Sequence, residues 1–326
     1  MRTSSLEDIV TDMGMREGYR FPAMLLSAIA LVSLGASPKL NDLDRRLDNL
    51  CDRLKGRMGY CLKVLNTGET IGHREDERFP SASTIKTGVM LEAIRQVEEG
   101  KLKWTDKKPV PATREASMWS YHFKDGTTPN LDGWVNLMVT VSDNTATMVV
   151  RDWLGTMNVN RRLEQLGLPN TKILGNAPES EKLVRRLRTQ FGMGMTTPKE
   201  MNRLLELIYR GQAASTAGCE KMIRILSHQY WDDWIGGSVP PGILCASKSG
   251  AINRSRSDTA IVFGPNPYIL TIYTDSQKDQ RWTSENEGDN AIIRIAGLVW
   301  NTLNPKMPYS PPAGYEKFVP TGGGVE

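Results

Sequence analysis

Strand-like segments lie at both ends of this chain, and a long, mainly helical stretch separates them. Alternating or β-forming residues occupy 58–65 and 69–73, and short apolar runs split by turns occupy 242–247, 258–263 and 268–274. From about 83 to 227, apolar residues recur at the steps of amphipathic helices. The simplest fold is of α/β (α+β) type, with one antiparallel sheet built from both chain ends and the helical stretch as a second lobe.

Helices are predicted on either side of this sheet and throughout the middle of the chain. Leucines at three- and four-residue steps predict one over 40–57, and 290–303 predicts a closing helix. The clearest helices of the middle are 83–98, 131–142, 145–153, 159–166 and 197–209. We therefore expect an α/β lobe of residues 37–82 and 228–303, a helical lobe of 83–227, and a loose proline- and glycine-rich tail over 304–326.

The apolar segment 21–34 near the N-terminus is too short to span a bilayer comfortably but suits the core of a signal peptide. Arg16 and Arg20 precede it, whereas the acids further upstream are unusual there and suggest a translation start at Met13 or Met15. A buried helix is the alternative interpretation. We expect residues 1–36 to be a signal peptide, and the mature protein to be periplasmic or secreted, without a membrane anchor.

The composition is that of a globular enzyme, with 39% hydrophobic and 24% charged residues. The net charge of +4 is spread along the chain, and we find no zinc-finger spacing, P-loop or RNA-binding signature, so no nucleic-acid partner is expected. None of His73, His122 and His228 stands in a metal-binding context, and no metal or organic cofactor is implied. The spacing of the cysteines at 51, 61, 219 and 245 resembles no zinc site and leaves open whether they pair.

The chain has a single Ser-x-x-Lys, at Ser83 and Lys86. If Ser83 opens a helix, the lysine lies one turn on and on the same face, so its amine can activate the hydroxyl without a histidine. The positive end of the helix also favours negative charge that develops there. By itself the tetrapeptide is weak evidence, because a capped helix start with a solvated lysine gives the same pattern.

Two further motifs follow in order. Ser142-Asp143-Asn144 lies in the middle of the chain, and Lys248-Ser249-Gly250 lies near its end. Ser-x-x-Lys, Ser-Asp-Asn and Lys-Thr-Gly are the working set of class A β-lactamases and penicillin-binding proteins, and Lys-Ser-Gly keeps the hydroxyl. A second Lys-Thr-Gly, at 86–88, overlaps the expected nucleophile helix, so it cannot form the side of the site that faces the nucleophile.

With these motifs, the chain from about 40 to 303 resembles a class A β-lactamase-type serine hydrolase of the penicillin-recognising superfamily. The stretch 74–80 is similar to the family's approach to its nucleophile, and Thr196-Thr197-Pro198 resembles the helix start after its omega loop. The resemblance implies a β-lactamase/transpeptidase-like fold. It also implies acyl-enzyme chemistry on a small β-lactam or a cell-wall-like peptide, most simply by a monomer.

The resemblance also implies roles for the catalytic residues. Ser83 would be the acylated nucleophile, and Lys86 would take its proton directly or through a water. Ser142 would pass a proton to the leaving nitrogen, and Asn144 would hold the substrate amide. The backbone N–H groups of Ser83 and Ala251 would form the oxyanion hole.

On the facing wall, the resemblance assigns the substrate carboxylate to Lys248 and Ser249, which with Gly250 form the third motif. Arg256 is a candidate second carboxylate anchor, and a solvated arginine at a strand end is the alternative. One family element is missing, the Glu-x-x-Leu-Asn of the omega loop that activates the deacylating water. Counting back from Pro198 points to Glu181, and counting forward from Asn144 points near Glu179. The alternative is that both glutamates pair with Arg185, Arg186 or Arg188 at the loop surface.

Three functions remain open at this point. The first is hydrolysis of β-lactams through an acyl-enzyme at Ser83. The second is slow lactam turnover by a D-alanyl peptidase or esterase that acts on cell-wall-like substrates. The third is a penicillin-binding sensor that is acylated and stays acylated.

Overall fold

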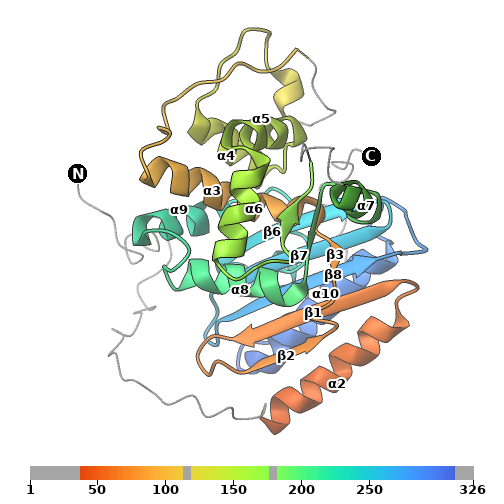
Figure 1. Cartoon of the computed structure of the whole chain (residues 1–326). Coiled ribbons are helices and arrows are strands. Elements are labelled where there is room, and N and C mark those ends of the chain that lie inside the picture. Colours follow the sequence, from red (N-terminus) through yellow and green to blue (C-terminus); the bar gives the residue numbers. More distant parts are fainter. Residues whose placement is uncertain (1–36, 113–118, 176–181, 313–326) are drawn as a thin grey trace.

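The computed structural model describes residues 37–112, 119–175 and 182–312 of the chain. Its centre is a five-stranded antiparallel sheet of strand order β2-β1-β8-β7-β6 (Figure 1). The strands are β1 (Arg57–Val64), β2 (Thr70–His73), β6 (Cys245–Ile252), β7 (Ser255–Val262) and β8 (Tyr268–Asp275). β1 pairs with β8 along its whole length, so the two ends of the chain meet in the middle of the sheet. This confirms the predicted antiparallel sheet built from both ends.

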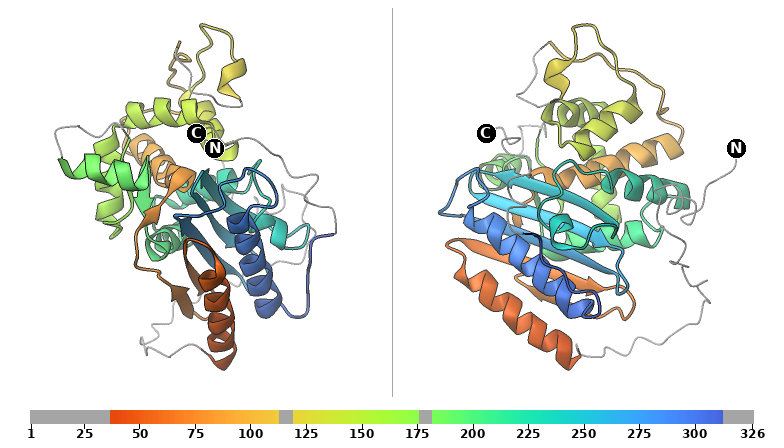
Figure 2. Two further views of the ribbon diagram at one scale, coloured as in Figure 1. Left: turned by 90° about the vertical axis from the view of Figure 1, so that its right-hand side faces the viewer. Right: turned by 180° about the vertical axis from the view of Figure 1, so that it is seen from behind.

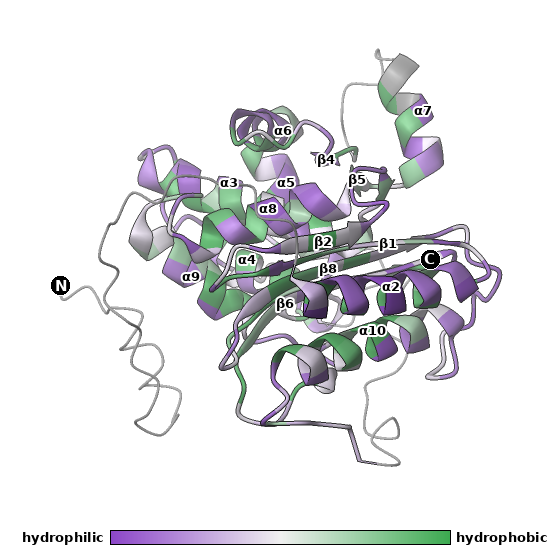
Figure 3. Ribbon diagram, turned by 90° about the horizontal axis from the view of Figure 1, so that it is seen from below, coloured by the Kyte–Doolittle hydropathy of each residue, from purple (hydrophilic) through white to green (hydrophobic). Residues whose placement is uncertain are grey.

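Two helices cover one face of the sheet (Figures 1 and 3). They are α2 (Pro38–Arg53) and α10 (Glu287–Leu303), the first and last helices that the structure describes. Leu43 and Leu47 of α2 and Ile292 and Val299 of α10 are buried in one apolar cluster with residues of the strands. The leucines whose spacing predicts the first helix therefore form the apolar stripe that the helix buries against the sheet.

The other helices gather on the opposite face (Figure 2). They are α3 (Lys86–Glu98), α4 (Leu131–Thr140), α5 (Asn144–Leu154), α6 (Thr156–Gln165), α7 (Lys182–Phe191), α8 (Pro198–Tyr209) and α9 (Thr216–Leu226), with the short 3₁₀ turns η1 (Ala82–Ile85) and η2 (Ser120–His122). A second apolar cluster joins α3, α4, α5, α8 and α9 to this face of the sheet. A third 3₁₀ turn, η3 (Gly236–Ser238), lies against α10 instead. The five helices that were given predicted ranges lie close to them, whereas α7 and α9 had no predicted range.

A second, three-stranded sheet was not predicted. It consists of β3 (Phe79–Pro80), β5 (Gly194–Thr196) and β4 (Lys172–Ile173), in that order. The backbone N–H of Ser81 donates to the carbonyl of Gly194 at 2.9 Å, so this sheet holds the segment that leads into η1. Strands of two or three residues are too short for a period-two pattern to reveal.

The two predictions about the chain ends, and the question of whether the cysteines pair, have separate outcomes in the structure. The predicted signal peptide lies outside the described residues, and none of the helices that the structure describes combines the length and apolarity needed to cross a membrane. The start of the predicted loose tail is instead held to α10, because the side chain of Asn301 bonds with the backbone of Tyr309 in both directions. All four cysteines are buried free thiols.

Candidate active site

Ser83 lies in the 3₁₀ turn η1, which runs directly into α3. The residue before it, Ala82, has a φ of 43°, a left-handed conformation that side chains other than glycine rarely adopt. Non-glycine residues held in this region cost roughly 1–3 kcal/mol and gather at functional sites. The turn therefore presents a partly buried Ser83 hydroxyl at the N-terminal end of a helix, as predicted from the sequence.

Lys86 is the first residue of α3, and its side chain is fully buried. Its Nζ lies 2.7 Å from the carbonyl oxygen of Ser142, 3.1 Å from the Oγ of Ser142 and 3.0 Å from the Oδ1 of Asn144. A buried amine with three such acceptors is held in one place. It connects the first predicted motif to the second, 56 residues later.

Ser142 lies in the connection between α4 and α5, and its φ is 59°. The next residue, Asp143, caps α5 by accepting from the backbone N–H of Ala146 at 2.8 Å. Its carboxylate also accepts from the N–H and the hydroxyl of Ser120, both at 2.9 Å. Asp143 thus joins the turn at Ser120 to the start of α5. These bonds hold the neighbouring Ser142, with its strained backbone, close to Lys86.

The third motif lies on β6, an edge strand that pairs with β7. The apolar pattern ended this strand at Ser247, but in the structure it continues through Lys248, Ser249 and Gly250 to Ile252. A Cβ added to Gly250 would lie 2.8 Å from the backbone nitrogen of Ser83. Only glycine lets the edge strand approach the nucleophile turn this closely.

Ala251 follows Gly250 on the same strand and lies opposite Arg256 in the register with β7. Because an edge strand leaves every second backbone N–H and C=O without a strand partner on one side, β6 offers free donors beside Ser83. Backbone donors of this kind, directed at a developing oxyanion, are worth roughly 3–4 kcal/mol each in acyl-transfer enzymes.

Lys248 is fully buried, and its Nζ donates to the carbonyl of Ser249 at 2.8 Å. Burial lowers the pKa of Lys248 to about 7, and the nearby carboxylate of Asp258 opposes this shift. Burial raises the pKa of Asp258 itself to about 8, although the backbone N–H of Ile235 donates to its carboxylate. Lys248 therefore changes its charge close to neutral pH.

Ser249 and its neighbours connect the third motif to the second. The Ser249 hydroxyl lies 3.5 Å from the carbonyl oxygen of Trp231, whose indole N–H donates to the carbonyl of Val141 at 3.2 Å. Val141 precedes Ser142. Trp231 thus bonds with residues of both the third motif and the segment before the second.

The Arg256 side chain lies on the other face of the sheet from Ser257 and the nucleophile turn. Its guanidinium lies 3.0 Å from Asp289 and 4.4 Å from the centre of the Trp282 ring, on the α10 side of the sheet. The reason is the alternation of side chains along a strand. Ser257, one residue on, lies opposite Gly250 and turns its hydroxyl to the carbonyls of Gly250 and Ser81. The prediction of Arg256 as a carboxylate anchor conflicts with this placement.

The predicted deacylation base Glu181 lies outside the described residues. The segment that follows it forms α7, and the C-terminal end of that helix is tied to the β6–β7 hairpin. The guanidinium of Arg254 donates to the carbonyl of Gln190 at 2.6 Å, a favourable place for a cation because the last carbonyls of a helix carry partial negative charge.

Sequence reasoning missed three residues of this site. Asp143 stood inside a recognised motif but received no role, Ser257 was passed over for its neighbour Arg256, and Asp258 was not connected to Lys248. Side chains alternate along a strand, so every second residue back from the apolar Ile261 faces the same way. This count could have placed the Ser257 side chain on the face that bears the nucleophile turn. No sequence signal indicates the proximity of Asp258 and Lys248, since it depends on the pairing of two strands.

The model of the beta-lactamase enzyme family matches residues 42–303. The beta-lactamase VEB-1 of Pseudomonas aeruginosa is 22% identical over 292 residues, which cover 85% of this chain and 96% of that protein. The crystal structure of a beta-lactamase from Sphaerobacter thermophilus superposes with a TM-score of 0.69 at 25% identity, covering 80% of this chain and 97% of that one. A variant of PBP-A in an acyl-enzyme complex with penicillin G superposes with a TM-score of 0.70 at 22% identity, covering 80% and 96%.

The family match spans the sheet, the helices on both of its faces and all three motifs, and the similar folds agree with the architecture derived above. The chain belongs to the beta-lactamase enzyme family, as a serine hydrolase of the class A type.

Proposed function

We propose that this protein hydrolyses the amide of β-lactams through an acyl-enzyme at Ser83. The observation that carries the proposal is the position of Lys86. This residue begins the nucleophile helix, and its buried Nζ lies 3.1 Å from the hydroxyl of Ser142. Relatives that bear the name beta-lactamase and cover most of this chain support β-lactams as the substrate class.

Acylation would use these groups in a fixed order. The Oγ of Ser83 attacks the lactam carbonyl, and its proton passes to the Lys86 amine directly or through a water. The carbonyl oxygen becomes an oxyanion that accepts from the N–H groups of Ser83 and Ala251. The C–N bond then breaks, and the Ser142 hydroxyl gives its proton to the leaving nitrogen and recovers one from Lys86.

Binding would use the opposite wall and the second motif. The Lys248 ammonium and the Ser249 hydroxyl would hold the substrate carboxylate, and Gly250 would leave room for the ring beside β6. The Asn144 amide would hold the side-chain amide of the substrate. Charge-assisted bonds to a carboxylate are roughly twice as strong as neutral ones, so the Lys248 charge contributes most to this binding.

Deacylation needs a base that activates water, and Glu181 is our proposal for it. If that base acts slowly, the same site would serve a D-alanyl peptidase or esterase, or a penicillin-binding sensor that stays acylated. The proposal includes export to the periplasm or exterior after removal of residues 1–36, and a monomeric enzyme. Sequencing of the mature N-terminus and light scattering test these two points.

The deciding experiment follows a chromogenic β-lactam and the intact mass of the protein in the same reaction, with Ser83→Ala as the control. Sustained turnover that the Ser83→Ala variant lacks supports the lactamase. A lasting adduct on Ser83 without turnover favours the sensor or, if D-alanyl peptides or esters are cleaved, the peptidase. Neither adduct nor turnover would refute acyl-enzyme chemistry at this site.

A further inference from the structure

We infer that Arg256 is a positioning residue, which fixes from the back of the sheet the end of β6 that carries Ala251. The inference rests on the proposed function, because it takes the Ala251 N–H as a donor of the oxyanion hole. It concerns the role of a side chain that the structure places away from the substrate.

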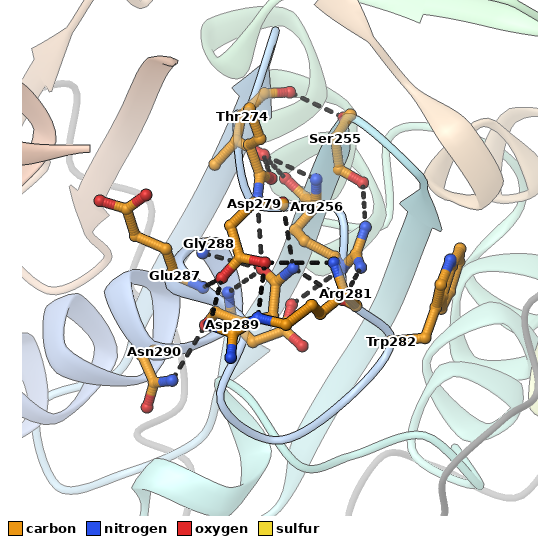
Figure 4. A network of polar contacts seen from close by, with 12 residues as sticks. Ser255, Arg256, Thr274, Asp279, Arg281, Trp282, Glu287, Gly288, Asp289 and Asn290 are labelled. Carbon is orange, nitrogen blue, oxygen red and sulfur yellow. Dashed lines mark hydrogen bonds and ion pairs between the residues drawn. The ribbon is translucent and has the colours of Figure 1, made fainter. Parts of the chain in front are cut away.

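The side chain of Arg256 is only 1% exposed, and each of its three guanidinium nitrogens lies near an oxygen (Figure 4). Its Nε faces Asp289 at 3.0 Å. Nη1 donates to the carbonyls of Ile252 and Ser255, and Nη2 donates to the carbonyl of Arg281 at 2.8 Å. One side chain therefore joins the β6–β7 hairpin, the loop after β8 and the first turn of α10.

Arg256 supports this hairpin because the turn between β6 and β7 does not have one of the favoured two-residue conformations. β6 and β7 are joined through Asn253 and Arg254, and neither residue has the positive φ that the favoured two-residue hairpin turns require. β6 is also an edge strand, so β7 is its one strand neighbour in the sheet. Arg256 is the direct cross-strand partner of Ala251 and holds the carbonyl of the next residue, Ile252.

The Trp282 side chain makes a second connection to the same hairpin. Its indole N–H donates to the Oδ1 of Asn253 at 2.8 Å, and its ring lies 4.4 Å from the Arg256 guanidinium. The backbone of Arg256 is fixed as well, because its N–H donates to the Thr274 hydroxyl at 2.6 Å and its carbonyl accepts from that hydroxyl at 2.8 Å.

The loop that receives Arg256 is itself tied to the start of α10 (Figure 4). The side-chain amide of Asn286, the cap of α10, donates to the carbonyl of Arg281 at 2.8 Å. The Asp279 carboxylate accepts from the Arg281 side chain at 2.8 Å and from the N–H of Glu287 at 2.9 Å. Arg256 thus couples the hairpin to a helix that packs against β7 and β8.

The effect on the reaction is geometric, because the Arg256 guanidinium lies on the α10 side of the sheet and acts through the hairpin. Catalytic groups must be held within roughly 0.5 Å of their productive positions, and a misplacement of about 1 Å can cost roughly 100-fold in rate. Lysine would keep the charge opposite Asp289, but a single ammonium cannot reach three carbonyls in two directions or stack on Trp282. Arg256→Lys therefore loosens the hairpin while the ion pair remains.

The test compares Arg256→Lys with the wild type in two measurements, the acylation rate constant with a penicillin and the infrared carbonyl band of the acyl ester on Ser83. We expect acylation to slow by roughly 10- to 100-fold. The carbonyl band should broaden and move to higher wavenumber, because weaker hydrogen bonds polarise the ester less. The dissociation constant of the penicillin should change little, since Lys248 and Ser249 are untouched.

A matched control disturbs another buried ion cluster that is far from the hairpin. Glu206 of α8 accepts from Lys63, Arg203 and Arg210 and is 4% exposed. Glu206→Gln should lower the free energy of unfolding without moving the carbonyl band. If it moves the band as Arg256→Lys does, general loss of stability explains the effect and the inference is wrong.

Trp282→Phe serves as a second variant in case Arg256→Lys does not fold, since it keeps a ring and removes the bond to Asn253. A wild-type carbonyl band and acylation rate in the folded variants would overturn the positioning role. Absence of any acyl-enzyme in the wild type is a different result, because it removes the proposed function and this inference with it.

Discussion

Gly250 and Ser83 lie so close together that a single methyl group on Gly250 would be 2.8 Å from the Ser83 amide nitrogen. The same methyl group would be 2.9 Å from the hydroxyl of Ser257 and 3.1 Å from the Cβ of Ala82. Backbone and short side chains surround the glycine, so no flexible group can move aside. The approach of the edge strand to the nucleophile turn is therefore a fixed dimension of the site.

Gly250→Ala should separate these two elements. We expect the acylation rate constant to fall by roughly 100-fold, because both proposed oxyanion donors border this contact. The free energy of unfolding should fall by about 1–3 kcal/mol through overpacking. Rapid-mixing kinetics and urea denaturation measure the two effects. Gly297→Ala in α10 is the control, because its added methyl meets nothing within 4 Å, and it should leave acylation unchanged.

The left-handed conformation of Ala82 predicts an unusual response to glycine. Ala82→Gly should raise the free energy of unfolding by about 1 kcal/mol, since glycine adopts a positive φ without strain. Ala93→Gly, the same change inside helix α3, should lower it by about 1 kcal/mol. Thermal or urea unfolding of both variants provides the comparison. Equal destabilisation by the two substitutions would mean that the turn before Ser83 stores no strain.

The pKa of Lys248, lowered by burial to about 7, predicts an alkaline limit on substrate binding. As the pH rises through 7, Lys248 loses its positive charge and the substrate carboxylate loses its partner. We expect KM for a carboxylate-bearing β-lactam to rise above that pH, in a titration of KM from pH 5.5 to 9. A KM that stays flat to pH 9 would contradict the assignment of Lys248 to the carboxylate.

The same pKa has a consequence for stability. The unfolded chain holds the Lys248 proton up to about pH 10.5, whereas the folded chain releases it near 7. The cost of burying the charge is therefore fully present below pH 7, and it falls away as the pH rises towards 10.5. Lys248→Met should accordingly stabilise the protein more at pH 6 than at pH 10, as measured by urea denaturation.

A substitution at Asp258 changes the pKa of Lys248 without altering a proposed binding residue. Its carboxylate opposes the lowering of the Lys248 pKa, so Asp258→Asn should lower that pKa further. The alkaline limit on KM then moves to lower pH. Asp76→Asn is the control, because Asp76 lies on the surface and pairs with Lys199. An unshifted profile for Asp258→Asn would show that this carboxylate does not influence Lys248.

Glu181→Gln tests the proposed base for deacylation. If Glu181 activates the water, the variant should acylate at the normal rate and then accumulate the Ser83 adduct, visible by intact mass. Glu179→Gln is the matched control from the same stretch and should turn over normally. The reverse pattern would assign the role to Glu179, and unchanged turnover in both would remove both glutamates from the mechanism.

The sequence predicted those features that depend on local patterns. The predicted helix periods, the strand runs at 58–65, 69–73 and 268–274 and the three motifs lie close to where the structure has them, because each is encoded by neighbouring residues. Arg256 was misplaced because a shift of one residue along a strand reverses the face of the sheet, and the register of β7 depends on its pairing. The strand β6 was ended too early because polar Lys248 and Ser249 hide an extended segment whose burial comes from other elements.

The pairing of β1 with β8 also dictates the order in which this protein can assemble. Arg57 and Asp275, which pair in this ladder, are 218 residues apart, so the sheet closes only after nearly the whole chain is available. The helices α3 to α6 pack on one another and can form earlier, whereas distant strand pairing is slow. Chains shortened before β8 thus contain the nucleophile, the lysine and both other motifs, and still lack the central strand that brings them into register.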